Sequence, residues 1–104
     1  MENWHRVASS SDLADGEALA VDLGGTPLAL YRIDGRIYAI SDVCTHEYAV
    51  LSQGFIEAGT IECPLHAAQF DIPTGRCLSG PAMEDLRTYE VRQDGNDVYV
   101  RQAE

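Results

Sequence analysis

The chain has 104 residues, of which 45 % are hydrophobic and 23 % are charged, a composition typical of one folded domain. Its formal charge of −10 argues against nucleic acid and anionic membranes as partners, because their negative charges would repel it, and favours a basic protein partner. No stretch approaches the roughly 18 apolar residues of a membrane span, and the N-terminus shows neither an apolar signal core nor a twin-arginine pair. We therefore expect a cytoplasmic protein.

Short apolar or alternating stretches, separated by Gly, Asp and Pro, predict an all-β fold of the antiparallel sandwich or barrel type. In the first part of the chain we expect strands at residues 4–8, 17–23, 28–33 and 36–40. The side chains of residues 9–12 can cap a short helical turn at Leu13. Asp34-Gly35 predicts a hairpin, because a type I′ turn requires positive φ at both central residues.

The second part of the chain continues the same pattern. We expect a hairpin of residues 54–57 and 60–62 turned at Ala58-Gly59, a strand at 69–72, a turn at 73–75, and strands at 87–93 and 98–102 joined by a turn at 94–97. No stretch requires a long helix. The predicted organisation is one domain over residues 1–104, with a scaffold of 1–40 and 81–104 and an insertion of 41–80.

Two short clusters in this insertion carry metal-binding side chains, Cys44-Thr45-His46 and Cys63-Pro64-Leu65-His66, with sixteen residues between His46 and Cys63. Two sulfur and two nitrogen ligands admit either a single zinc ion or an iron–sulfur cluster. Zinc fingers usually take both sulfurs from one knuckle and both nitrogens from the other. Here each knuckle supplies one of each, which suits a two-iron centre spanned by both loops.

This ligand pattern resembles that of the Rieske proteins, in which one iron takes two Cys and the other takes two His. Residues 70–75 and 80–82 also resemble the family's segments after the second ligand pair. In size the chain is most similar to the small Rieske ferredoxins of bacterial aromatic-ring dioxygenase systems, such as those for biphenyl and naphthalene. The resemblance implies a Rieske-type antiparallel β sandwich or barrel with a small cluster-binding β subdomain, and one [2Fe–2S] cluster held by Cys44, His46, Cys63 and His66.

The resemblance also implies a function in aromatic hydrocarbon catabolism. The chain would carry one electron at a time from a flavin-containing ferredoxin reductase to a terminal oxygenase with Rieske and non-haem iron centres, and would not itself be an enzyme. We expect a monomer. Two alternatives stay open: a Rieske-like subunit of a larger reductase, such as an assimilatory nitrite reductase, and a zinc-stabilised interaction module. A visible absorption spectrum discriminates against zinc, because zinc is colourless.

The residues around the ligands predict a low reduction potential. High-potential family members carry Cys at positions 49 and 65, Ser at 68 and Tyr at 70, where this chain has Ala49, Leu65, Ala68 and Phe70. The hydroxyl groups of that Ser and Tyr would stabilise the more negative reduced cluster through hydrogen bonds to sulfur. Without them we expect a potential on the order of −150 mV, the low end for Rieske centres.

Four residues near the ligands are candidates for partner docking: Glu47, Tyr48, Leu65 and Pro81. Glu47 and Ala67-Ala68 also replace glycines that are common in the family, so the alanines would be strained if these positions required positive φ. We predict that Cys77 is a small buried apolar residue and that His5 is a strand residue outside the ligand set.

Overall fold

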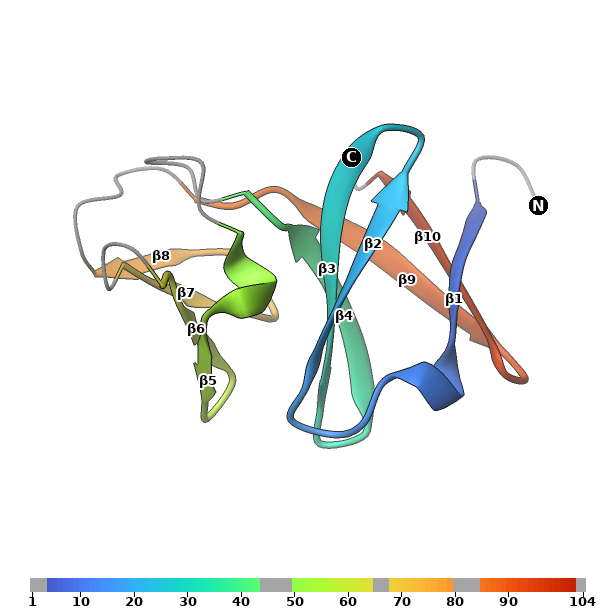
Figure 1. The fold of residues 1–104 in the computed structure, drawn as a ribbon, viewed down its shortest axis with the longest axis horizontal. Helices are drawn as coiled ribbons and strands as arrows, with labels where there is room; N and C mark the ends of the chain where they lie inside the picture. Colours follow the sequence, from blue (N-terminus) through green and yellow to red (C-terminus); the bar gives the residue numbers. More distant parts are fainter. Residues whose placement is uncertain (1–3, 44–49, 65–67, 80–84, 103–104) are drawn as a thin grey trace.

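A computed structural model describes residues 4–43, 50–64, 68–79 and 85–102. These residues form two antiparallel sheets, a larger one that carries both ends of the described chain and a smaller one beside it (Figure 1). The all-β antiparallel fold predicted from the sequence is confirmed. No helix in the described ranges is long and apolar enough to cross a membrane.

The larger sheet curls into a nearly closed barrel. Among the described residues it has six strands in the spatial order β1 (His5–Ser9), β10 (Asp97–Gln102), β9 (Thr88–Asp94), β4 (Arg36–Ser41), β3 (Thr26–Ile33) and β2 (Ala18–Leu23). The two edge strands, β1 and β2, approach each other and so bring the sheet round on itself. The barrel therefore joins the first third of the chain to its last segment, with the smaller sheet between them in sequence.

The smaller sheet contains four described strands in chain order: β5 (Phe55–Glu57), β6 (Thr60–Glu62), β7 (Gln69–Asp71) and β8 (Cys77–Ser79). One residue from each strand lies opposite its neighbour across the sheet, and together these four side chains pack against the barrel: Ile56, Ile61, Phe70 and Cys77. The alternate residues of these strands face outward, as strand geometry requires.

Two buried clusters show how the sheets are joined. One lies inside the barrel and includes Leu28 and Leu30; the other lies between the sheets and includes Ala29, Tyr31 and Phe70. Because successive side chains of a strand point to opposite faces, β3 supplies both clusters in turn. This explains its continuous buried run from residue 28 to residue 31.

The turns follow their local chemistry. Asp34 and Gly35 have φ of 52° and 81°, so the predicted type I′ conformation is confirmed. Ala58 and Gly59 also join β5 to β6 with positive φ, 50° and 78°. An alanine in this region is strained, which indicates that the surrounding hairpin determines its conformation.

The structure differs from the sequence prediction in several places. The strand β8 and the 3-10 turn η2 (Leu51–Gln53) were not predicted. The 3-10 turn η1 (Ser10–Asp12) follows β1 as expected, but its N-cap residue Ser9 makes no side-chain cap hydrogen bond. The Ser10 hydroxyl instead accepts a hydrogen bond from the Arg32 guanidinium, which joins the turn to β3.

Candidate metal centre

Cys63 directly follows β6 and faces the buried cluster between the two sheets. Its side chain is 1 % exposed, and its neighbours in that cluster include Ala68 and Phe70. The Cys63 amide donates a hydrogen bond to the Ala68 carbonyl at 2.8 Å. This bond closes the base of the second predicted ligand loop, so Cys63 leaves the sheet from a fixed position.

The first predicted ligand loop has a closed base as well. Val43 and Val50, the described residues on either side of 44–49, form an isolated antiparallel bridge. Leu51 then begins η2 with a fully buried side chain in the same cluster as Cys63. Leu51, Cys63 and Ala68, which lie close to the ends of the two predicted ligand loops, therefore belong to one core cluster.

The segment after β8 is held in the same manner. The Leu86 amide donates to the Gly75 carbonyl at 2.7 Å, and the Cys77 amide donates to Asp85 Oδ1 at 2.8 Å. Leu86 is buried in the cluster that contains Cys63 and Leu51. Leu51, Cys63 and Leu86, from three separate parts of the chain, thus pack in one core.

The burial of Cys63 fits a thiolate ligand of an iron–sulfur cluster. Its side chain lies in the packed core directly after β6, so the sheet fixes its position. A rigid scaffold beneath ligand loops limits structural change on electron transfer. When bound, the cluster supplies a one-electron redox couple, and the predicted thiolates and imidazoles would hold it.

Most of the residues predicted for the site fall outside the described ranges. This applies to the ligands Cys44, His46 and His66 and to all four docking candidates, Glu47, Tyr48, Leu65 and Pro81. Their roles stay predictions, as does that of Cys63. Among the described residues alone, no group of three or more His, Cys, Asp and Glu side chains could hold a metal ion.

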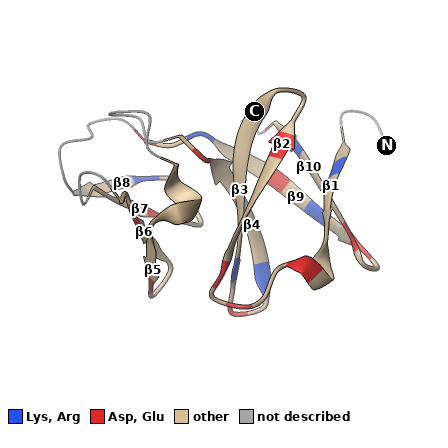
Figure 2. Ribbon diagram, viewed as in Figure 1, with Lys and Arg blue, Asp and Glu red and all other residues tan. Residues whose placement is uncertain are grey.

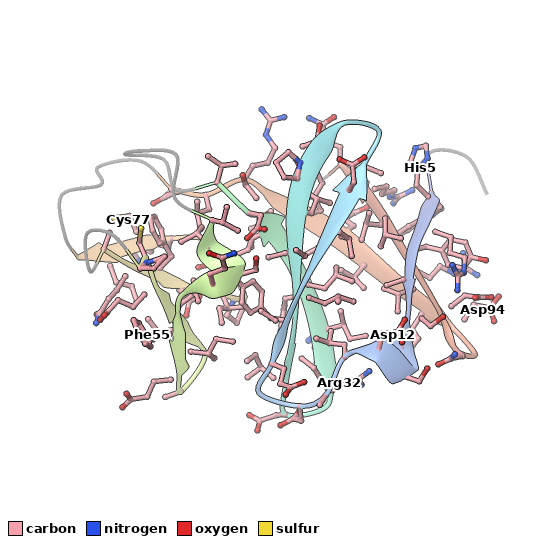
Figure 3. All side chains as sticks on the ribbon, in the orientation of Figure 1. His5, Asp12, Arg32, Phe55, Cys77 and Asp94 are labelled. Carbon is pink, nitrogen blue, oxygen red and sulfur yellow. The ribbon has the colours of Figure 1, made fainter. Side chains whose placement is uncertain are left out.

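The other sequence predictions near the site can be compared with the structure. Cys77 is half-buried rather than buried, although it packs against the core cluster as an apolar residue would. Ala68 is fully buried and is not among the described residues with positive φ, so replacing glycine there introduces no such strain. His5 is an exposed strand residue at the opposite end of the molecule from Cys77 (Figure 3).

A buried carboxylate that is hydrogen-bonded to a half-buried serine was missed in the sequence. Asp42 is 3 % exposed, and both of its carboxylate oxygens accept hydrogen bonds from Ser52. Burial raises the pKa of Asp42, while the two hydrogen bonds from Ser52 act to lower it. An aspartate just after a strand looks like an ordinary surface loop residue, so only the fold reveals its burial.

Tyr31 carries a second buried polar group in this region. Its side chain is fully buried, and its hydroxyl has no hydrogen-bond partner among the described residues. Burial, and then the charge of Asp42, raise the pKa of Tyr31 above its usual value.

Tyr31→Phe should therefore stabilise the protein by about 1 kcal/mol, because it removes a hydroxyl that is buried without compensation. Urea denaturation of the two proteins with equal cluster content measures this difference in the free energy of unfolding. A loss of stability would instead show that the hydroxyl is hydrogen-bonded in the folded protein.

Comparison with known proteins assigns the chain to a family. The Rieske [2Fe-2S] domain matches residues 3–90. The ferredoxin component of the naphthalene 1,2-dioxygenase system of Pseudomonas aeruginosa is 40 % identical over 99 residues, which cover 95 % of each chain.

Solved structures agree with the fold. The ferredoxin of carbazole 1,9a-dioxygenase from Nocardioides aromaticivorans IC177 superposes with a TM-score of 0.92 at 35 % identity and covers 98 % of this chain and 100 % of its own. A chain from a complex of reduced oxygenase and oxidized ferredoxin in carbazole 1,9a-dioxygenase gives a TM-score of 0.89 at 37 % identity, over 97 % and 94 % of the two chains. This chain belongs to the Rieske [2Fe–2S] domain family, whose cofactor is one [2Fe–2S] cluster.

Proposed function

We propose that this protein is the ferredoxin component of an aromatic-ring dioxygenase system. It takes one electron at a time from a flavin-containing ferredoxin reductase and delivers it to a Rieske and non-haem-iron terminal oxygenase in the cytoplasm. The end-to-end match to ferredoxin components, 95 % of both chains for the naphthalene system, is the observation that carries this proposal. The chain is an electron carrier rather than an oxygenase.

Cys44, His46, Cys63 and His66 are the proposed ligands of the cluster, and residues 41–80 the proposed cluster-binding insertion. Support comes from the hydrogen-bonded bases of the two loops and from the burial of Cys63 between them. Because Cys63 is buried in the core, we expect the two thiolates to hold the cluster on the side of the barrel and the two imidazoles on the side of the partner.

The function is tested by electron transfer between separate components. The chemically reduced protein, mixed anaerobically with an oxidised terminal oxygenase of such a system, should be reoxidised in a single exponential phase while the oxygenase Rieske centre is reduced. Omitting the protein should stop transfer from the reductase to the oxygenase. Unchanged transfer between reductase and oxygenase in its absence would refute a carrier role.

The reduction potential should lie at the low end of the Rieske range, on the order of −150 mV. Ala68 and Phe70 are both fully buried beside Cys63 in the core cluster, and neither can donate a hydroxyl hydrogen bond to sulfur. The double variant Ala68→Ser, Phe70→Tyr should raise the midpoint potential, since hydrogen bonds to sulfur favour the reduced state. Redox titration measures both values, and a native midpoint above about +100 mV would contradict the interpretation.

Partner docking is proposed over the two histidine ligands, at Glu47, Tyr48, Leu65 and Pro81. The net charge of −10 provides long-range attraction to a basic partner, and Figure 2 shows acidic segments at the β3–β4 turn and η1 as well as in the smaller sheet. Glu47→Lys should slow transfer to one or both partners and weaken its dependence on salt, with little change in midpoint potential.

Asp94→Lys provides the matched control, because Asp94 is the exposed last residue of β9 and lies at the far end of the barrel (Figure 3). All seven basic residues of the chain are arginines. Carbodiimide cross-linking, which joins carboxylates to amines, therefore cannot link side chains of this protein to one another and reports on partner lysines directly. Cross-links and rate effects at Asp94, with none at Glu47, would place the docking face on the other end.

A further inference from the structure

We propose that Asp42 is a positioning residue for the cluster: its buried carboxylate ties together the two ends of the first ligand loop, and its negative charge lowers the reduction potential. The inference rests on the proposed ligand set, since the loop between the tied ends contains Cys44 and His46. It concerns a residue outside that set.

The main chain and side chain of Asp42 both bind the residues that follow the loop. The Leu51 amide donates to the Asp42 carbonyl at 2.8 Å. The Ser52 amide donates to Asp42 Oδ1 at 2.6 Å, and the Ser52 hydroxyl donates to Oδ2 at 2.9 Å. On its other side, the Asp42 amide donates to the Pro27 carbonyl of β3 at 3.1 Å. Asp42 thus anchors both ends of the loop to the barrel.

This carboxylate is costly to bury. Asp42 is the one charged residue that is buried among the described residues, and neither of the ion pairs described for this chain involves it. Among the described residues, Ser52 alone donates hydrogen bonds to the carboxylate and so compensates part of its lost hydration. A carboxylate in an exposed loop would keep its hydration. The burial of the Asp42 carboxylate therefore indicates a specific role.

Asp42 lies directly beside the core cluster that contains Cys63. Leu51, whose amide donates to the Asp42 carbonyl at 2.8 Å, is a member of that cluster. Along the chain, Cys44 follows Asp42 by two residues, a separation of at most about 7 Å between Cα atoms. An added electron on the cluster is therefore repelled by Asp42 through a poorly screening interior.

Asp42→Asn removes the negative charge but can keep the hydrogen bonds to Ser52. Its amide oxygen can still accept from the Ser52 amide, and its NH2 group can donate to the Ser52 hydroxyl. We expect it to raise the equilibrium constant for reduction about tenfold, which is a shift of about 59 mV for one electron. Ser52→Ala keeps the charge and loses one hydrogen bond, so it should lower Tm and leave the potential close to that of the native protein. Asp94→Asn, an exposed change of the same net charge, should move the potential little.

The measurements are redox titration, iron and sulfide content, and Tm of the purified holoproteins. Equal potentials for Asp42→Asn and Asp94→Asn would overturn the proposal. If Asp42→Asn holds no cluster, Asp42→Glu decides: a cluster retained by Glu supports a required carboxylate, whereas loss in both variants refutes a role for the charge. Native protein without iron and sulfide would instead overturn the proposed function itself, a separable result.

Discussion

Cys63→Ala is expected to abolish the [2Fe–2S] cluster, whereas Cys77→Ala is expected to leave it in place. Cys63 is buried at the base of the second ligand loop, and no other described cysteine occupies a comparable position. Cys77 lies on β8, an edge strand of the smaller sheet. Removal of one of four ligands leaves an iron without one of its two protein thiolates, so cluster content should fall to background.

The readouts are iron and acid-labile sulfide per chain, together with visible absorption. His66→Ala and His5→Ala form a second matched pair, because His5 is exposed in β1 and lies far from the smaller sheet. The ligand assignment is wrong if Cys63→Ala keeps two irons, two sulfides and an unaltered spectrum, or if Cys77→Ala loses them.

Gly75→Ala should destabilise the fold by roughly 3–5 kcal/mol, the second large effect. Gly75 has φ of +73°, and a Cβ atom there would lie 2.4 Å from the Leu86 carbonyl oxygen and 2.9 Å from Thr88 Cγ2. The strained conformation costs about 1–3 kcal/mol and the overpacking about as much again. The Leu86 amide also donates to the Gly75 carbonyl, so a forced separation would break the connection between the smaller sheet and β9.

Gly24→Ala is the control for backbone strain alone. Gly24 has φ of +57°, and nothing lies within 4 Å of the position that a Cβ atom would take there. Its cost should be about 1–2 kcal/mol. Urea denaturation at matched cluster content measures both variants, and equal losses would show that Gly75 is constrained only by its dihedral angles.

The features that sequence reasoning predicted correctly depend on neighbours along the chain. The Asp34-Gly35 turn follows from the positive φ that both positions require. The hairpin of β5 and β6 likewise depends on the Ala58-Gly59 turn and its flanking alternation. The ligand set, which stays a prediction, likewise rests on spacing within one segment and needs no knowledge of the fold.

The features that were missed depend on distant contacts. Strand β8 has only three residues and a register shift opposite β7, so its sequence shows no apolar–polar alternation that would predict a strand. β3 begins at Thr26, two residues before the predicted start, and at Pro27 it pairs with β2 but not with β4. Asp42 becomes a buried anchor only when η2 brings Ser52 to it.

The central claim is that this chain carries a single electron on a Rieske [2Fe–2S] cluster. A stoichiometric reductive titration of the aerobically purified protein, followed by EPR, tests it most directly. We predict two irons and two sulfides per chain, an EPR-silent oxidised state, and a Rieske-type signal that reaches full intensity after one electron per chain. A chain that holds one zinc ion and no iron, or a cluster that gives no Rieske-type signal on reduction, would contradict it.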